Sequence, residues 1–309
     1  MDDTSPKNTS KKALVTGASG MLGSYVCRAL NDDFAIDSLG LNDADKIRCN
    51  LMEDAPDLTG QRYDLVVHCA GSEKDELASL NTTGTAHLLQ ALSQNPPKWF
   101  VYVSSCSVYG EEGEGVGEET MLAPATEAAR SKEKAEREVA RWAAENDVIL
   151  TIIRPARMFG TGVGGDTLRL FNDALNGSFI HIRGNEARTS LVTALDVAKA
   201  IAALYPLGGI YNLADGTNPK LKTMVEAMTA NAGREKRLTT LPASWAGWLW
   251  RLCRWIPAID RNLRPDVAER RMKTLTIDGS KAAIDAHLRY FNTIEVIARR
   301  DSDYPYDEK

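Results

Sequence analysis

The sequence predicts an α/β protein with a doubly wound parallel sheet and a smaller, mixed α/β C-terminal lobe. From residue 11 to about 155, short continuous apolar runs alternate with segments of helical periodicity, a pattern typical of a parallel sheet covered by helices on both faces. After residue 157 a glycine-rich loop, 160–165, precedes mainly helical sequence. We therefore expect a disordered leader over 1–10, a sheet domain over 11–157 and a second lobe over 158–309, with some late segments returning to the sheet.

The composition is that of an ordinary soluble globular protein. The chain has 309 residues, 43% hydrophobic and 26% charged, with a net charge of −5. It has no block of Lys and Arg residues, so the charge pattern does not indicate nucleic-acid binding. Five cysteines without a CxxC pair favour reduced thiols in a cytoplasmic protein, and four scattered histidines give no support for a metal site. No apolar run is long enough to span a membrane, and the polar N-terminus lacks a secretory signal.

The individual elements follow from local pattern. Apolar runs predict strands at 13–16, 34–39, 64–69, 99–104 and 148–153, and helical periodicity predicts helices at 21–30, near 82–92 and at about 125–146. The second lobe holds shorter strands at 178–182 and 209–213. Trp245, Trp248 and Trp255 recur at helical spacing; we expect a helix packed on this lobe, with a membrane-surface contact or a dimer surface as alternatives.

A glycine-rich loop lies between the first strand and the first helix. Glycines three apart permit a tight turn and close approach of backbone to a pyrophosphate, which the helix N-terminus then attracts. The sequence therefore predicts a dinucleotide site that includes Gly17, Ser19, Gly20, Met21, Leu22 and Gly23. After the second strand an acid would bind the ribose of NAD, whereas an arginine would accept the 2′-phosphate of NADP. Asp37 and Asp43 are the candidates and no arginine is adjacent, which favours NAD over NADP.

Six motifs in order carry a family resemblance. Residues 16–23 match a TGxxGxxG loop, 68–71 an H-x-A-[AG] turn and 81–85 an N-x-x-G-T helix start. Residues 103–110 match an SSxxVYG signature, 154–160 an RPxxxxG segment and 195–198 a D-V-A helix start. Together they resemble the extended short-chain dehydrogenase/reductase family, the NAD-dependent epimerase/dehydratase-like nucleotide-sugar enzymes with a Rossmann-type fold.

The resemblance implies a catalytic serine at Ser105 and a lysine at Lys132, because Ser131-Lys132 followed by Glu136 matches the family's S-K-x-x-x-E segment. The family places a tyrosine one helical turn before this lysine, where the ammonium lowers the phenol pKa for proton transfer. Here that position is Ala128.

Three interpretations of Ala128 stay open. The tyrosine was removed by engineering, a natural member uses another acid, or the protein binds cofactor without catalysis. The candidates for another acid are Glu127, Thr126 and Ser107, since no tyrosine lies between Tyr109 and Tyr205.

The resemblance also implies further contacts and a reaction class. It adds to the cofactor site Asn50, Leu51, Cys69, Ala70, Gly71, Asn81, Lys132 and Pro155, and to the substrate site Ser107, Arg157 and Arg188. The expected activity is that of an epimerase or 4-keto-reductase acting on a nucleotide-activated sugar, in a homodimer. The alternatives are a non-enzymatic cofactor-binding protein of the same fold and a 3β-hydroxysteroid dehydrogenase-like reductase, which residues 275–282 resemble.

Overall fold

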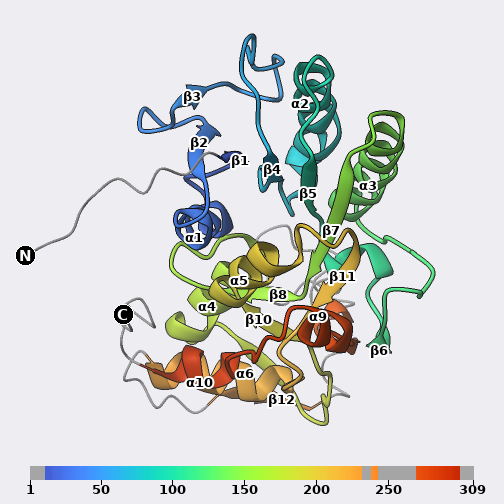
Figure 1. The fold of residues 1–309 in the computed structure, drawn as a ribbon. Coiled ribbons are helices and arrows are strands. Elements are labelled where there is room, and N and C mark those ends of the chain that lie inside the picture. The colour runs from blue at the N-terminus through green and yellow to red at the C-terminus, as the bar shows by residue number, and fades with distance from the viewer. Residues whose placement is uncertain (1–10, 232–237, 243–268, 300–309) are drawn as a thin grey trace, which may run out of the picture.

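A parallel seven-stranded sheet forms the centre of the computed structural model, which describes residues 11–231, 238–242 and 269–299. The strand order is β11-β7-β5-β4-β1-β2-β3, and all the pairs are parallel. The strands are β1 (Lys12–Thr16), β2 (Ala35–Gly40), β3 (Ile47–Arg48), β4 (Leu65–His68), β5 (Trp99–Val103), β7 (Ile149–Pro155) and β11 (Gly209–Leu213). The chain reverses its direction of winding between β1 and β4, which confirms the predicted doubly wound Rossmann fold (Figure 1).

Helices cover both faces of the sheet because successive strand residues point to opposite sides. Ala13 and Val15 of β1 pack under α1 (Met21–Leu30) and α5 (Ala194–Leu204). Leu14, between them, faces the layer formed by α2 (Thr85–Leu92) and α3 (Glu127–Glu145). The strands are apolar at consecutive positions because both of their faces are buried under helices.

A second lobe is built from α4 (Gly165–Asn176), α6 (Leu221–Asn231) and α10 (Thr293–Ala298), which share a separate apolar core and gather below the sheet in Figure 1. Two-stranded pairs join β8 (Arg157–Phe159) to β10 (Leu191–Thr193), β9 (Ile180–Ile182) to β12 (Thr239–Leu241), and β6 (Gly113–Val116) to β13 (Leu275–Ile277), which precedes α9 (Ser280–Asp285). Between the lobe's segments, β11 returns to the edge of the main sheet beside β7.

Some expectations fall on parts of the chain that are not described. The leader over 1–10 and the tryptophan-rich segment with Trp245, Trp248 and Trp255 lie outside the described residues. Across the ranges that the structure does describe, no helix has the length and apolarity needed to cross a bilayer.

Candidate active site

The carboxyl ends of five neighbouring strands lie side by side, and most of the predicted site residues follow them in the loops at this end of the sheet. Gly17 begins the loop after β1 with φ of 63°, and its N–H donates to Leu39 O at 2.8 Å. A Cβ at Gly17 would lie 2.9 Å from the backbone N and Cα of Ala70, so only glycine fits between the two loops. A Cβ at Gly23 would overlap the carbonyl of Gly17, which is why α1 can begin so close to the strand.

The N-terminus of α1 is open toward this end of the sheet. Gly20 is its N-cap, and no side chain caps the helix. The first N–H groups of a helix have no intrahelical partner and carry a partial positive charge. Met21 and Leu22 stand in that first turn, so the loop and the helix start form an anion cradle of the size a pyrophosphate needs.

A buried histidine fixes the neighbouring turn after β4. His68 Nδ1 lies 2.6 Å from Thr16 Oγ1 and its Nε2 lies 3.0 Å from Thr85 Oγ1. Thr16 Oγ1 also accepts from the N–H of Ala70 at 3.2 Å, and Cys69 N donates to Thr16 O. Burial, with a smaller effect from the charge on Lys132, lowers the pKa of His68 to about 3. His68 is therefore a neutral structural link that holds the cofactor turn, with no role in proton transfer.

The end of β2 carries a carboxylate that sequence reasoning missed. Asp45 Oδ2 accepts from Asn42 N at 3.0 Å and from Ser19 Oγ, in the glycine loop, at 3.5 Å. A Cβ at Gly40, the last residue of β2, would overlap this carboxylate. Asp45 is therefore an acid beyond the second strand that contacts the glycine loop.

The two acids that the sequence singled out have other partners. Asp37, in the middle of β2, is buried and contacts Lys12, Lys46 and the hydroxyl of Tyr63. Burial alone would raise its pKa, but these bonds hold the pKa below its ordinary value. Asp43 is exposed and pairs with Arg48 at 2.8 Å.

Asn50 and Leu51 follow β3 and flank the helix layer. The side chain of Asn50 accepts from Met52 N at 3.2 Å. Leu51 is buried, and its carbonyl lies 2.8 Å from His87 Nδ1. These contacts fix the turn after β3, and they do not test the predicted cofactor contacts of Asn50 and Leu51.

Lys132 reaches the same end of the sheet from α3. Its ammonium is buried, donates to Val103 O at 2.8 Å and lies 5.4 Å from the ring centroid of Tyr102. Burial lowers its pKa, and the negative charges of Glu73 and Glu136 oppose that effect. A Cβ at Gly71 would lie 2.5 Å from Lys132 Nζ, so the turn after β4 and the ammonium are in direct contact.

Asn81 ties the same turn to α3. Its Oδ1 accepts from Ser72 N at 2.8 Å, and its Nδ2 donates to Ser72 O at 2.8 Å and to Ser131 Oγ at 2.9 Å. Asn81 stands in a π-helical turn, η2 (Leu80–Gly84), that precedes α2. With Lys132 and Gly71, it confirms that the motifs converge in space.

Ser105 and Ser107 form a hydroxyl pair after β5, at the start of the short helix η3 (Cys106–Tyr109). Ser105 Oγ accepts from Ser107 N at 3.2 Å and from Ser107 Oγ at 3.0 Å. A hydroxyl has two acceptor positions and one donor. Both acceptor positions of Ser105 are therefore used by Ser107, and neither of these bonds uses the Ser105 proton.

Ala128 is covered and has no proton to give. Only 3% of the residue is exposed, and its N–H donates to Asp75 Oδ1 at 2.8 Å. Thr126 is the N-cap of α3, accepting from Ala129 N, and Glu127 is exposed and paired with Arg130. Two of the three acids considered in place of the tyrosine thus point to the helix or its surface.

Tyr109 is held in a buried network. Its hydroxyl accepts from Arg154 Nη1 at 2.8 Å and donates to Asn212 Oδ1 at 2.8 Å. Arg154 also makes a bidentate pair with Glu136, with distances of 3.0 and 2.6 Å. This network joins α3, β7 and β11, and it engages the Tyr109 hydroxyl both as an acceptor and as a donor.

The predicted substrate arginines bond to residues outside this cluster. Arg157, the first residue of β8, is half-buried and donates from Nη1 to Thr167 Oγ1 at 3.4 Å. Arg188 is exposed and donates from Nη1 to Asn218 O at 3.0 Å. In the described part of the chain, no cluster of His, Cys, Asp and Glu is arranged to hold a metal.

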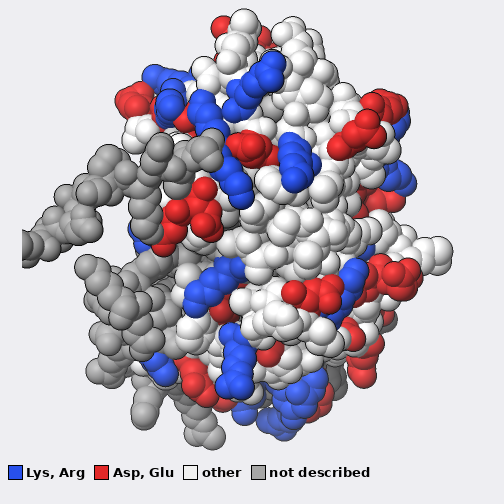
Figure 2. Space-filling model, viewed as in Figure 1, with Lys and Arg blue, Asp and Glu red and all other residues white. Residues whose placement is uncertain are grey.

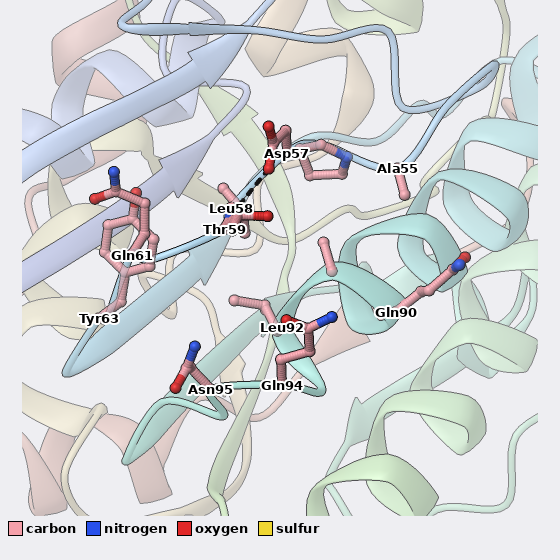
Figure 3. A pocket seen from close by; sticks show the side chains of 12 residues that line it. Ala55, Asp57, Leu58, Thr59, Gln61, Tyr63, Gln90, Leu92, Gln94 and Asn95 are labelled. Atoms are coloured by element: carbon pink, nitrogen blue, oxygen red, sulfur yellow. Dashed lines mark hydrogen bonds between the residues drawn. The ribbon is translucent and has the colours of Figure 1, made fainter.

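A separate pocket lies at the amino ends of the strands, the end of the sheet opposite the candidate site. It has a volume of about 180 Å³ and is lined by residues before β4 and by residues at and just after the end of α2, among them Tyr63, Gln90 and Asn95. Figure 3 shows mainly uncharged polar side chains around it, with the Asp57 carboxylate turned back to Thr59 N at 3.0 Å. Because these residues precede their strands, the pocket is remote from the site at the carboxyl ends.

A family model described as the NAD dependent epimerase/dehydratase family matches residues 13–214. The chain therefore belongs to this family of Rossmann-fold enzymes. It is 24% identical over 255 residues to N-acetyl-alpha-D-glucosaminyl-diphospho-ditrans,octacis-undecaprenol 4-epimerase from Escherichia coli O157:H7, covering 74% of this chain and 75% of that protein.

Solved structures share the fold. MoeE5 in complex with UDP-glucose and NAD has a TM-score of 0.73 at 20% identity, with 94% of this chain and 97% of that chain covered. RMD from Pseudomonas aeruginosa, complexed with NADPH, has a TM-score of 0.70 at 20% identity, with the same coverage. The description of the matching family names NAD as its cofactor.

The residues present fit such a cofactor. The close approach of Gly17 to Ala70 and the uncapped start of α1 provide the pyrophosphate cradle. Asp45 contacts the glycine loop through Ser19, and Lys132 reaches the carboxyl end of β5 from α3, so both could hold parts of a dinucleotide.

Proposed function

We propose that this protein is a NAD-dependent oxidoreductase that acts on a nucleotide-activated sugar, as an epimerase or a 4-keto-reductase. The observation that supports this most is the serine–lysine pair of the site. Lys132 is buried with its ammonium against the turn at Gly71, and Ser105 has a free proton at the carboxyl end of the adjacent strand. Bound dinucleotide would supply hydride acceptance and donation.

Each residue has a defined task in this proposal. Ser105 donates its proton to the sugar oxygen and polarises it. Lys132 holds the nicotinamide ribose, and its charge stabilises negative charge that develops on the sugar oxygen. Asn81 keeps the turn and α3 in register, since it bonds both Ser72 and Ser131.

The cofactor is proposed to be NAD rather than NADP. The Asp45 carboxylate would accept bonds from the ribose hydroxyls and repel a 2′-phosphate. Hydrogen bonds to a charged group contribute about 1.5–3 kcal/mol, so Asp45→Ala should weaken NAD binding roughly 10- to 150-fold. The ratio of the affinities of the protein for NAD and for NADP should fall as well. Asp43→Ala is the matched control, because Asp43 is exposed and pairs only with Arg48. Calorimetric titration measures the NAD affinity of both variants. Equal losses of affinity in Asp45→Ala and Asp43→Ala would contradict the assignment of Asp45 as the ribose ligand.

The activity test uses purified protein, NAD or NADH, UDP-hexoses, 4-keto nucleotide sugars and a diphosphate-linked lipid sugar. We expect epimer or reduced sugar with a nucleotide sugar, and loss of product in Lys132→Met. Product only from the lipid-linked sugar would overturn the substrate class. Cofactor binding without turnover of any sugar would favour the non-enzymatic alternative.

We also propose a cytoplasmic homodimer that associates through α2 and α3. The four described cysteines, Cys27, Cys49, Cys69 and Cys106, are free thiols, which supports the cytoplasmic location.

The proposed dimer surface includes a groove of about 610 Å³. It runs between Thr82, Thr83 and Ala86 on one side and Lys134, Arg137 and Arg141 on the other. On the face shown in Figure 2, basic and acidic side chains are interspersed. Sedimentation equilibrium of wild type and Arg137→Glu tests the dimer; a monomeric wild type would refute it.

A further inference from the structure

The loop from Gly71 to Asp75 occupies the place beside Ala128 and is fixed at both ends. At its start, Ser72 N and Ser72 O both bond the side chain of Asn81. At its end, Asp75 Oδ1 accepts from the N–H of Ala128 at 2.8 Å. The short helix η1 (Asp75–Leu77) continues from there and contacts α3. This path explains why Ala128 is covered although its side chain is only a methyl group.

Glu73 lies between these two fixed points. Burial lowers the pKa of Lys132 in α3 and raises the pKa values of Tyr102 in β5 and Cys106 in η3, and the negative charge of Glu73 raises all three. The loop holds Glu73 between Ser72, which bonds Asn81, and Asp75, which bonds Ala128. Among the described residues, no hydrogen bond or ion pair engages the Glu73 side chain, which is exposed.

The other charged and titratable groups near Lys132 do not offer the same chemistry. Glu136 is paired with Arg154 and His68 is neutral and bonded on both ring nitrogens. Burial raises the pKa of the Cys69 thiol far above neutrality. Glu73 is the carboxylate of this set that is open to solvent and unpaired.

We infer that Glu73 is the proton acceptor and donor of the site, in the place left by the tyrosine absent at position 128. In sugar oxidation the hydroxyl O–H bond breaks and its proton passes to the Glu73 carboxylate. The carbinol C–H bond breaks as a hydride, whose electron pair reduces NAD, and a C=O bond forms. In the reverse direction the Glu73 carboxylic acid returns the proton to the ketone oxygen as hydride returns to carbon. This inference rests on the proposed function.

The test compares Glu73→Gln, Glu73→Ala and the control Glu76→Gln. Glu76 is an exposed glutamate in η1, three residues further along the same loop. General acid–base catalysis contributes about 10²- to 10⁴-fold, so we expect kcat of both Glu73 variants to fall about 100-fold or more with little change in KM. Added formate should restore part of the activity of Glu73→Ala. Activity of Glu73→Gln within threefold of wild type would overturn the inference.

A second measurement does not depend on turnover. Since the Glu73 charge opposes the lowering of the Lys132 pKa, Glu73→Gln should lower that pKa further, and Glu76→Gln should not; ¹⁵N NMR of the lysine ammonium measures it. An unchanged Lys132 titration would refute the placement of Glu73 even if no sugar is turned over. Inactive wild type with the expected Lys132 shift would reject the proposed function, and with it the catalytic role of Glu73, while keeping the placement of Glu73 near Lys132.

Restoring the tyrosine separates this inference from simple removal of the usual acid. Ala128 is 3% exposed beneath the loop, so Ala128→Tyr must displace the segment that carries Glu73. We expect Ala128→Tyr to be no more active than wild type. A gain of tenfold or more would show that the site lacks only its tyrosine and would contradict a role for Glu73.

Discussion

Replacement of Arg154 by methionine should destabilise the protein strongly, because it leaves a buried carboxylate without its partner. Arg154 and Glu136 are 4% and 5% exposed in their side chains and are joined by two bonds of 3.0 and 2.6 Å. Breaking a buried ion pair on one side costs about 3–5 kcal/mol. The Tyr109 hydroxyl also loses a donor, so we expect a cost toward the upper end of this range.

An exposed pair on the same helix provides the control. Arg130 and Glu127 lie 3.1 Å apart, and their side chains are 52% and 61% exposed. Exposed pairs contribute about 0.2–1 kcal/mol, so Arg130→Met should cost less than about 1 kcal/mol. Burial therefore separates the two variants.

Urea unfolding followed by tryptophan fluorescence measures these free energies. The double variant Glu136→Leu/Arg154→Met should recover most of the loss, because replacing both members of a buried pair by apolar residues is often neutral. Equal costs for Arg154→Met and Arg130→Met, or no recovery in the double variant, would refute this reasoning.

Three further predictions concern the supports of the site. Gly71→Ala should cost about 1–3 kcal/mol and weaken NAD binding, because its Cβ would lie 2.5 Å from Lys132 Nζ; thermal unfolding and calorimetry measure this, and an unaltered affinity would contradict it. His68 is neutral in the fold, with a pKa of about 3 against 6.5 when unfolded. Wild type should therefore lose up to about 1.4 kcal/mol of stability per pH unit below pH 6.5, a slope that is smaller in His68→Gln. The pKa of Asp37 is held below its ordinary 3.8, so its stabilisation is complete above that value and is lost as pH falls below it through the pKa of the folded state. Asp37→Asn should cost about 1–3 kcal/mol at pH 7 and approach wild type in acid; a constant difference in urea titrations from pH 7 to pH 3 would be the contrary result.

Elements with strong local signals were predicted from sequence almost to the residue. The helix over 21–30 is α1, and the strand over 209–213 is β11. Boundaries moved where tertiary contacts decide them. The helix expected near 82–92 begins as the π-helical turn Leu80–Gly84, which allows Asn81 to bond both Ser72 and Ser131.

The site was predicted in part, for a physical reason. Glycine spacing and strand ends locate the cradle, because they depend on local backbone geometry. Asp45 and Glu73 were missed, since each belongs to a loop whose path is set by distant partners, Ser19 for one and Asn81 and Ala128 for the other. Asp37 was an expected ribose ligand because it lies in the second strand, but only the fold shows it bonded to Lys12 and Tyr63.

Turnover of a nucleotide sugar by the unmodified protein tests the central claim most directly. Wild type and Lys132→Met would be incubated with NAD and UDP-hexoses, or with NADH and 4-keto nucleotide sugars, and the products resolved by NMR. We predict an epimerised or reduced nucleotide sugar from wild type, although residue 128 is alanine, and none from Lys132→Met. NAD bound at saturation with no sugar product from wild type would contradict the account.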